Sequence, residues 1–127
     1  MDQATYDKGM QIRRAVLGDD YVDKATANID DFTEDFQKMV TTYCWGEIWG
    51  REGLDRRTRS IINLAMISAL NRPHELAAHL RGTLNNGLTR AEIKEILLQV
   101  GIYAGVPAMV DSFRIAKQVL GEIDAGK

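Results

Sequence analysis

The apolar residues of this chain recur at the spacing of an α-helix along almost its whole length. Six segments repeat apolar side chains every three or four positions, which is typical of helices that bury one face. They are residues 4–17, 31–49, 56–70, 73–86, 90–104 and 107–120. Strand signals are missing, because no run alternates β-branched and polar residues. With a short helical turn at 21–26, the pattern predicts an all-α domain of six or seven helices.

Residues at the segment boundaries indicate where helices begin and end. Thr89 and Glu92 form the pattern T-x-x-E of a capping box, in which two side chains satisfy free backbone N–H groups. Asp31, Asp55 and Asn71 are the expected N-caps of three other helices. Three glycines are expected to follow helix ends, namely Gly18, Gly87 and Gly105.

Two segments contain residues that are expected in the protein interior. The segment 56–70 is apolar around most of its circumference, so we expect a central helix that is buried on several sides. Trp45 and Trp49, one turn apart, are expected in the core or at an interface. Tyr43 and Cys44 are expected to pack as well, with the cysteine as a small apolar filler.

Length and charge narrow the class of protein. A chain of 127 residues without an internal repeat or linker predicts one domain, residues 1–127. The formal net charge is −2 and the charges are interleaved, which argues against nucleic-acid binding. No apolar run approaches the ~20 residues that span a bilayer, and the N-terminal sequence MDQATYDKGM lacks the apolar region of a signal peptide. We therefore expect a cytoplasmic protein without a membrane partner.

His74 and His79 look like part of a zinc-protease motif, but their spacing does not fit one. The motif H-E-x-x-H puts two histidines about 40° apart around a helix, so that both face one metal. His74 and His79 are five positions apart, which separates them by about 140°. Catalytic zinc takes three protein ligands, and the chain has no third histidine and no second cysteine. Only a set mixed with distant carboxylates would bind zinc, and we predict no metal site.

A different spacing on the same helix brings polar groups together. Arg72, Glu75 and His79 lie at i, i+3 and i+7, within about 60° of one another. Glu75 and His79 fall at one edge of the helix's apolar stripe, and Arg81 falls at the other edge. A Glu–His pair at i, i+4 is also an ordinary helix-stabilising contact. Spacing alone therefore leaves open both a half-buried pocket and a surface ion pair.

Three stretches of the chain together resemble the carboxymuconolactone decarboxylase family. They are CWGEIWGREGLDRRTRSIINLAM at 44–66, ALNRPHELAAHLRGTLNNGLTRAEIKEILLQVGIYAGVPA at 69–108, and the tail VDSFRIAKQVL. The pattern N-R-P-H-E-L with H-x-R-G-x-L-N-N-G is similar in particular to the 4-carboxymuconolactone decarboxylase branch of that family. The resemblance implies an all-α fold of the AhpD-like type, working as a homotrimer or homohexamer.

The resemblance also implies a reaction. In the β-ketoadipate pathway of protocatechuate degradation, 4-carboxymuconolactone (γ-carboxymuconolactone), a small dicarboxylated lactone, loses CO2 and becomes β-ketoadipate enol-lactone. No metal or organic cofactor takes part. The carbon that loses CO2 is conjugated to the lactone carbonyl, so the remaining electrons spread to that oxygen. The protein then needs to stabilise the developing negative charge and return a proton to carbon.

Roles for individual residues follow from this implied reaction. His79 is the leading candidate to donate to the lactone oxygen or to reprotonate the ring carbon, since histidine titrates near neutrality. Glu75 would orient its imidazole, and Glu47 in the family-like stretch G-E-I-W is the second candidate acid. An arginine should bind the acetate carboxylate through two hydrogen bonds, and the options are Arg81, Arg72 and Arg59. His79 and Arg81 point about 160° apart, so a pocket that uses both must be completed by another helix or a neighbouring subunit.

Two alternatives remain, and a third is excluded. Another decarboxylase or lactone-processing enzyme of the same family would act on a related carboxylated lactone. A non-catalytic helical oligomer would keep the scaffold and bind such lactones without turnover. The family's thiol peroxidases, of the alkylhydroperoxidase D type, need the pattern C-x-x-C-x-x-x-H. Here Arg72 and Glu75 stand at the two cysteine positions, so neither the attacking nor the resolving thiol is present.

Overall fold

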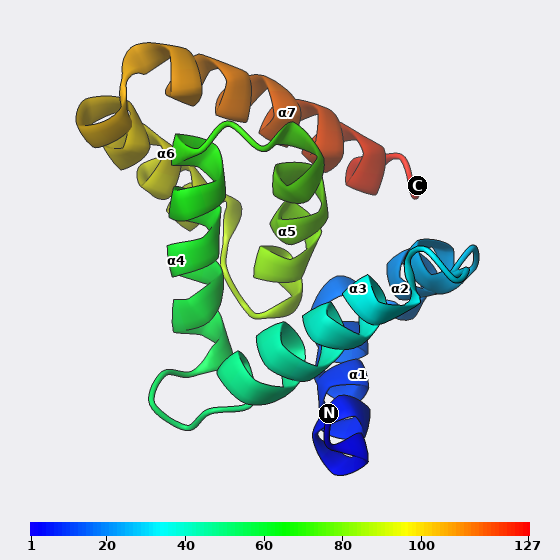
Figure 1. Cartoon of the computed structure of the whole chain (residues 1–127). Helices are drawn as coiled ribbons and strands as arrows, with labels where there is room; N and C mark the ends of the chain where they lie inside the picture. Colours follow the sequence, from blue (N-terminus) through cyan, green and yellow to red (C-terminus); the bar gives the residue numbers. More distant parts are fainter. The chain divides into compact units, whose positions relative to one another are not determined.

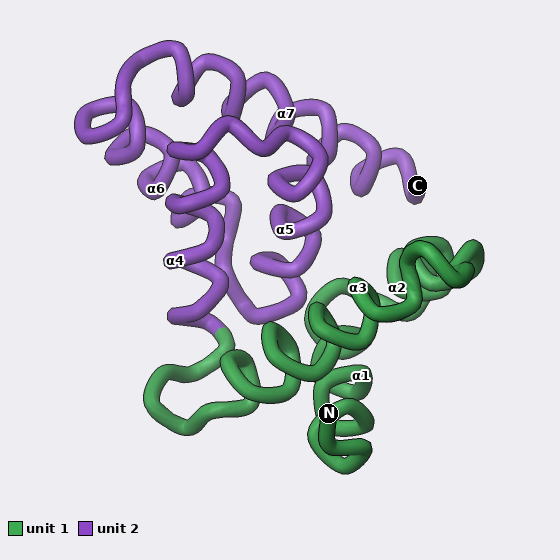
Figure 2. The backbone as a smooth tube through the Cα atoms, in the orientation of Figure 1, with its two compact units in different colours: residues 1–56 green, residues 57–127 purple.

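The computed structural model describes all 127 residues and contains helices but no strands. Seven α-helices and one π-helix follow one another (Figure 1), in the order α1 (Gln3–Leu17), α2 (Asp19–Thr26), α3 (Glu34–Met39), η1 (Val40–Ile48), α4 (Arg56–Ala69), α5 (Pro73–Asn85), α6 (Arg90–Ala104) and α7 (Val106–Asp124). The predicted all-α class is confirmed. None of these helices combines the length and the apolar character needed to cross a membrane. The chain forms two compact units, residues 1–56 and 57–127 (Figure 2), and each is described by itself.

The first unit is built on close packing between α1 and η1. Its core consists of apolar residues of α1, α2 and the η1 region, namely Ile12, Val16, Leu17, Val22, Trp45 and Trp49. The two tryptophan rings are stacked with their centroids 4.9 Å apart, and both side chains are buried. The core position expected for Trp45 and Trp49 is therefore confirmed.

Two glycines allow α1 and η1 to approach each other at backbone distance. A Cβ atom added to Gly9 of α1 would overlap the carbonyl oxygen of Thr41, and one added to Gly46 of η1 would lie 2.5 Å from the carbonyl oxygen of Thr5. Beside this contact, the buried Arg13 donates a hydrogen bond of 3.3 Å to the Thr41 hydroxyl. The glycines and this hydrogen bond together hold the two helices in direct contact.

The prediction that Asp31 caps a long helix is wrong. The carboxylate of Asp30, not of Asp31, accepts the backbone N–H groups of Phe32 and Thr33, both at 3.0 Å. These bonds form a separate turn, and α3 begins only at Glu34. An aspartate can satisfy local N–H groups in a turn as well as at a helix N-terminus, and the sequence holds two adjacent aspartates that compete for that role.

The second half of the segment 31–49 is a π-helix, where an ordinary α-helix is predicted. η1 covers nine residues, and at its end the N–H of Trp49 bonds to the carbonyl of Cys44, five positions earlier. π-Helical turns are rare and often lie at functional sites. An apolar repeat cannot reveal one, because it reports which side is buried and not the hydrogen-bond partner.

The second unit packs α7 against both α5 and α6. Its core combines apolar residues of all four helices, namely Leu64, Leu76, Leu80, Ile93, Leu97, Ala116 and Val119. Leu76 and Leu80 are buried, as expected for the apolar stripe of α5. This core fixes α5 in its orientation and thereby determines where its polar residues point.

Helix ends in the second unit agree with the predicted signals, with one exception. Thr89 and Glu92 form the full capping box, in which each side chain accepts the other residue's backbone N–H. Gly87 and Gly105 have φ values of 93° and 108°, which glycine adopts without strain. The exception is Asn71, which has a φ of 56° and lies one position before the N-cap of α5.

The prediction that α4 is buried on several sides is wrong. Its fully buried residues form one stripe, Ser60, Leu64 and Ser68. Two large apolar side chains of the same helix, Ile62 and Met66, are exposed, as is Leu70 directly after it. Apolar residues around a whole helix indicate that its surface favours burial. How many helices pack around it depends on the tertiary or quaternary structure.

Tyr43 and Cys44 are exposed, so the prediction that they pack in the core is also wrong. η1 turns Thr41, Thr42, Trp45 and Gly46 inward instead. The glycine contact with α1 selects that side of the helix, and the thiol is left in solvent.

Candidate active site on helix α5

Helix α5 buries His79 and leaves His74 in solvent. The imidazole of His79 is only 9% exposed, whereas His74 is fully on the surface. Their different environments follow from the angle of about 140° that five helical positions create. The two histidines therefore do not share a face. No group of three or more His, Cys, Asp or Glu side chains is arranged to hold a metal ion.

Burial and a nearby carboxylate act in opposite directions on the pKa of His79. Burial has the larger effect and lowers the pKa below its ordinary value of 6.5, because a buried imidazolium loses hydration. The negative charge of Glu75, one turn earlier, raises the pKa by a smaller amount. At neutral pH the imidazole is therefore uncharged, with one N–H to donate and one nitrogen to accept.

This lowered pKa makes folding stability depend on pH. Because the unfolded chain has the higher histidine pKa, it binds more protons than the native state below about pH 6.5, and stability falls as the pH falls through that window. We expect urea unfolding to show this loss between about pH 7.5 and pH 5, and His79→Gln to reduce it. Three carboxylates contribute to stability in a different pH range, because their pKa values are lowered from 3.8. Their contributions to the free energy of unfolding are lost at lower pH, and the residues are Asp2, Asp30 and Asp124.

His74→Gln is the matched control for this measurement, because it removes an imidazole that is already exposed. It should leave the pH dependence of the unfolding free energy as in the unmodified protein. Parallel pH profiles for the unmodified protein and His79→Gln would contradict the prediction.

The three candidate arginines lie in different surroundings. Arg81 donates to the carboxylate of Glu122 on α7 at 3.2 Å, so its guanidinium already has an ionic partner. Arg72 is exposed and donates to the backbone carbonyl of Leu70 at 3.2 Å, without a salt bridge. Arg59 lies half-buried on α4. Unlike Arg81, Arg72 therefore has a guanidinium without an ionic partner.

Arg72 also lines a polar cavity of about 200 Å³ between α4, α5 and α7. Two buried hydroxyl-bearing residues line the same cavity, Ser68 of α4 and Ser112 of α7. Arg114 of α7 lines it too, and its guanidinium is paired with Asp111 at 2.8 Å. Arg114 was not a candidate from sequence, because it lies on another helix and no sequence spacing connects it to Arg72.

Glu47, the second candidate acid, lies in the π-helix η1 of the first unit and is exposed. Its neighbours Trp45 and Gly46 are buried against α1. The structure thus places Glu75 where its charge acts on the buried His79 of α5, and it places Arg72 at the N-cap of that helix. A role for Glu47 beside them stays a prediction.

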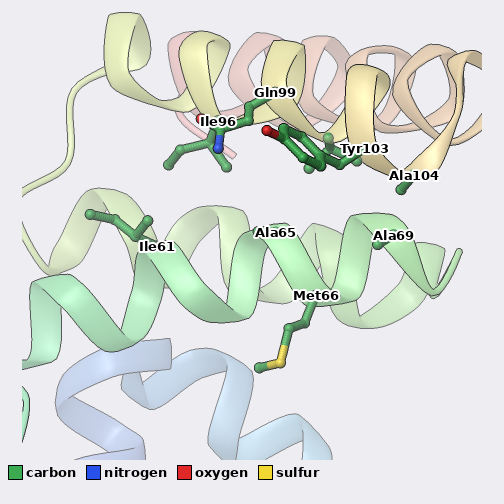
Figure 3. Close-up of a pocket in the computed structure, with 9 residues that line it drawn as sticks. Ile61, Ala65, Met66, Ala69, Ile96, Gln99, Tyr103 and Ala104 are labelled. Carbon is green, nitrogen blue, oxygen red and sulfur yellow. The ribbon is translucent and has the colours of Figure 1, made fainter.

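An apolar cavity of about 350 Å³ lies between α4 and α6 (Figure 3). Ile61, Ala65 and Ala69 of α4 face Ile96, Gln99 and Tyr103 of α6 across it, while Met66 points away from α6. None of its lining residues is charged. A carboxylate placed there would lose its hydration without gaining an ionic partner, so this cavity is unsuited to a doubly charged ligand.

The family of the chain is decided by a comparison with known proteins. Residues 34–118 match the Carboxymuconolactone decarboxylase family. The chain belongs to this family. The matched range extends from α3 into α7 and includes every site residue discussed above.

Three curated relatives of this carboxymuconolactone decarboxylase family member are named as decarboxylases. A 4-carboxymuconolactone decarboxylase of Acinetobacter baylyi is 40% identical over 122 residues, which cover 96% of this chain and 91% of that protein. The nitrosuccinic acid decarboxylase npaB of Metarhizium robertsii is 36% identical over 96% of this chain and 86% of its own length. A 4-carboxymuconolactone decarboxylase of Pseudomonas putida is 46% identical over 46 residues, 36% of this chain.

Proposed function

We propose that this protein is a carboxy-lyase that converts 4-carboxymuconolactone into β-ketoadipate enol-lactone and CO2 without a cofactor, in the degradation of protocatechuate. The observation that carries the proposal is the 40% identity, over nearly the full length of both chains, with the 4-carboxymuconolactone decarboxylase of Acinetobacter baylyi. The Glu75–His79 pair on α5, with a buried imidazole, supports it chemically.

The substrate itself can hold the electrons that CO2 leaves behind. The bond between the ring carbon and its carboxylate breaks, and the electron pair passes through the ring double bond to the lactone carbonyl oxygen. The resulting dienolate takes one proton on a ring carbon and becomes the enol-lactone. The protein therefore has to bind two carboxylates, stabilise one developing oxyanion and supply one proton.

We assign the oxyanion contact and the proton to His79. A neutral imidazole donates its N–H to the developing negative charge, and such a bond strengthens as the charge grows. Burial keeps the pKa of His79 lowered although Glu75 opposes it. The carboxylates of a bound substrate would act in the same direction as Glu75 and favour the protonated form that delivers the proton. Glu75 positions and charges the imidazole, and Glu47 remains the second candidate acid.

We assign the substrate's acetate carboxylate to Arg72 rather than to Arg81. Arg72 lies at the N-cap of α5 and has no salt bridge, whereas Arg81 is paired with Glu122. The polar cavity beside Arg72 supports this choice, because the buried hydroxyl-bearing residues Ser68 and Ser112 line the same hollow. Arg59 of α4 stays the third candidate.

Arg72→Ala is expected to lower kcat/KM for 4-carboxymuconolactone by about tenfold or more, mainly through KM, since a bidentate ionic contact contributes roughly 1.5–3 kcal/mol. Arg72→Lys should recover only part of the loss, because lysine keeps the charge but not the planar pair of donors. Arg81→Ala is the matched control, with an expected change of less than about threefold. Steady-state kinetics of enol-lactone formation measure all three, and a larger loss for Arg81→Ala would reverse the assignment.

We also propose that the protein works as a cytoplasmic homotrimer or homohexamer, with residues 1–127 acting as one domain and the site completed at a subunit interface. The exposed apolar side chains of the second unit support the oligomer, namely Ile62, Met66, Leu70, Leu98, Ile102, Tyr103, Val106 and Val110. Exposed large apolar side chains in this number favour association.

A second candidate substrate is nitrosuccinic acid, which the similarity to the Metarhizium robertsii enzyme favours. Its carboxyl group is on the carbon that bears the nitro group, so loss of CO2 leaves electrons that the nitro oxygens can hold. The two substrates share two carboxylates and an internal electron acceptor. The same arrangement of arginine and histidine would serve both.

The test is to give the purified protein freshly generated 4-carboxymuconolactone, with EDTA present, and to measure CO2 release and enol-lactone formation. Nitrosuccinic acid in a parallel reaction tests the second candidate. Rapid CO2 release from the lactone, unaffected by EDTA, would establish the proposed reaction. A folded protein that releases CO2 only from nitrosuccinic acid would transfer the assignment to that substrate. Release from neither, with lactone binding retained, would support a non-catalytic binding protein.

A further inference from the structure

The acidic segment, residues 29–36, presents an exposed aromatic side chain between negative charges. Its sequence is IDDFTEDF, with four acidic residues and no basic one. Phe32 is 93% exposed and Phe36 is 56% exposed. The turn that holds Phe32 outward is ordered, because Asp30 accepts its backbone N–H at 3.0 Å. A phenylalanine held in solvent by a defined turn favours a partner that covers it.

The basic groove, between α6 and α7, has the complementary character. It is a hollow of about 790 Å³ with an apolar floor that includes Leu97, Phe113 and Leu120. Lys94 and Lys117 line it from the two helices, are exposed and make no salt bridge. Arg90 also lines the groove, but both of its terminal nitrogens are bound to Asp124. The groove thus offers an apolar floor and two unpaired ammonium groups.

The segment and the groove match in charge as well as in apolar character. Asp31 and Asp35 of the acidic segment make no salt bridge, whereas Glu34 is paired with Lys38 at 3.2 Å. Two unpaired carboxylates beside Phe32 therefore correspond to the two unpaired ammonium groups beside the apolar floor. Opposite charges around an apolar contact favour the correct partner and suppress association of like-charged surfaces.

We propose that the acidic segment of one copy of this chain binds in the basic groove of a second copy, with Phe32 on the apolar floor and Asp31 and Asp35 beside Lys94 and Lys117. A second copy is the partner that the charges favour, because each chain carries one segment and one groove, and both are open to solvent in the single chain. This contact deepens the homo-oligomer proposed above by naming the surfaces that meet.

Charge reversal tests the contact. The variants are Lys94→Glu with Lys117→Glu, Asp31→Lys with Asp35→Lys, and all four changes in one chain. All four positions are exposed, so the fold should be retained. Each double variant should raise the concentration at which the oligomer dissociates by about tenfold or more, because like charges then meet. The four-fold variant should recover association, since the charges are exchanged and the net charge is unchanged.

Sedimentation velocity over a range of protein and salt concentrations measures these shifts. Lys24→Glu with Lys127→Glu is the matched control, since it makes the same change in net charge at exposed lysines outside the groove. A double variant in the groove that associates like this control would overturn the proposal. So would a four-fold variant that stays dissociated while it remains folded.

A photoreactive p-benzoylphenylalanine in place of Phe32 identifies what that side chain touches. A cross-linked product of two chain masses, joined between position 32 and peptides of α6 or α7, is the expected result. Cross-linking within one chain, or to other helices, would overturn the proposal. CO2 release from 4-carboxymuconolactone is followed in parallel, so that loss of association with measurable turnover, or the reverse, separates this contact from the proposed reaction.

Discussion

His79→Ala is expected to lower kcat for CO2 release from 4-carboxymuconolactone by about a hundredfold or more, since a positioned proton donor contributes at least that much. His79 is the buried histidine of α5, and Glu75 lies one turn away to tune it. Alanine leaves neither an N–H for the developing oxyanion nor a proton for the ring carbon. Spectrophotometric measurement of enol-lactone formation at saturating substrate gives the rate.

Two further variants separate the chemistry from the fold. His79→Gln keeps a polar side chain of similar reach and can donate a hydrogen bond, but it cannot deliver a proton near neutral pH. It should recover part of kcat if charge stabilisation dominates and little of it if proton transfer dominates. His74→Ala, which changes the exposed histidine, should have nearly the same kcat as the unmodified protein. Near-normal turnover by His79→Ala, with native circular dichroism, would remove the assignment and direct attention to Glu47.

Gly9→Ala is expected to destabilise the protein by about 3 kcal/mol, at the upper end of the usual cost of overpacking. The added methyl group would overlap the backbone carbonyl of Thr41, and its next nearest neighbour is the backbone nitrogen of Gly46, 2.8 Å away. Neither obstacle is a flexible side chain, so α1 and η1 would have to separate. Urea unfolding and thermal melting measure the loss, with a fall in Tm of roughly 3–5 °C for each kcal/mol.

Gly121→Ala is the matched control, because it makes the same chemical change within a helix where nothing lies within 4 Å of the added atom. Alanine lowers the entropy of the unfolded chain and suits the helix, so this variant should gain about 0.5–1 kcal/mol. The two substitutions are therefore expected to differ in sign. A Gly9→Ala protein as stable as the unmodified one would show that the two helices are not held at backbone distance.

The predicted helices and the observed ones agree closely because their signals are local. The capping box of Thr89 and Glu92 involves residues three positions apart, and it forms as expected. The wrong predictions arise where one local sequence signal is compatible with two structures. Adjacent aspartates at 30 and 31 both suit a cap, and only the structure shows that Asp30 takes the role in a turn. The π-helix escapes prediction because its hydrogen bonds skip one residue more than those of an α-helix.

The candidate site also combines properties that depend on nearby residues in the sequence with properties that depend on tertiary contacts. The common side of Glu75 and His79 follows from their spacing of four positions within one helix. Arg72 does not follow this geometry, because it is the N-cap residue of α5 and lies outside the helical repeat. The choice among the arginines could not be made from the sequence. Arg81 forms a salt bridge with Glu122, which lies on a helix far along the chain. Arg114 enters the cavity beside Arg72 for the same reason, through the packing of α7 against α5.

The amino-acid sequence by itself determines the all-α class, most helix boundaries, the separation of His74 from His79 and the absence of a thiol pair. These properties depend on residues within about one or two helical turns of each other. The tertiary structure decides that His79 is buried with a lowered pKa, that Arg72 is free of a carboxylate partner, and that α4 remains half exposed. Burial and ion pairing depend on which distant helices lie alongside, and that is known only once the chain has folded.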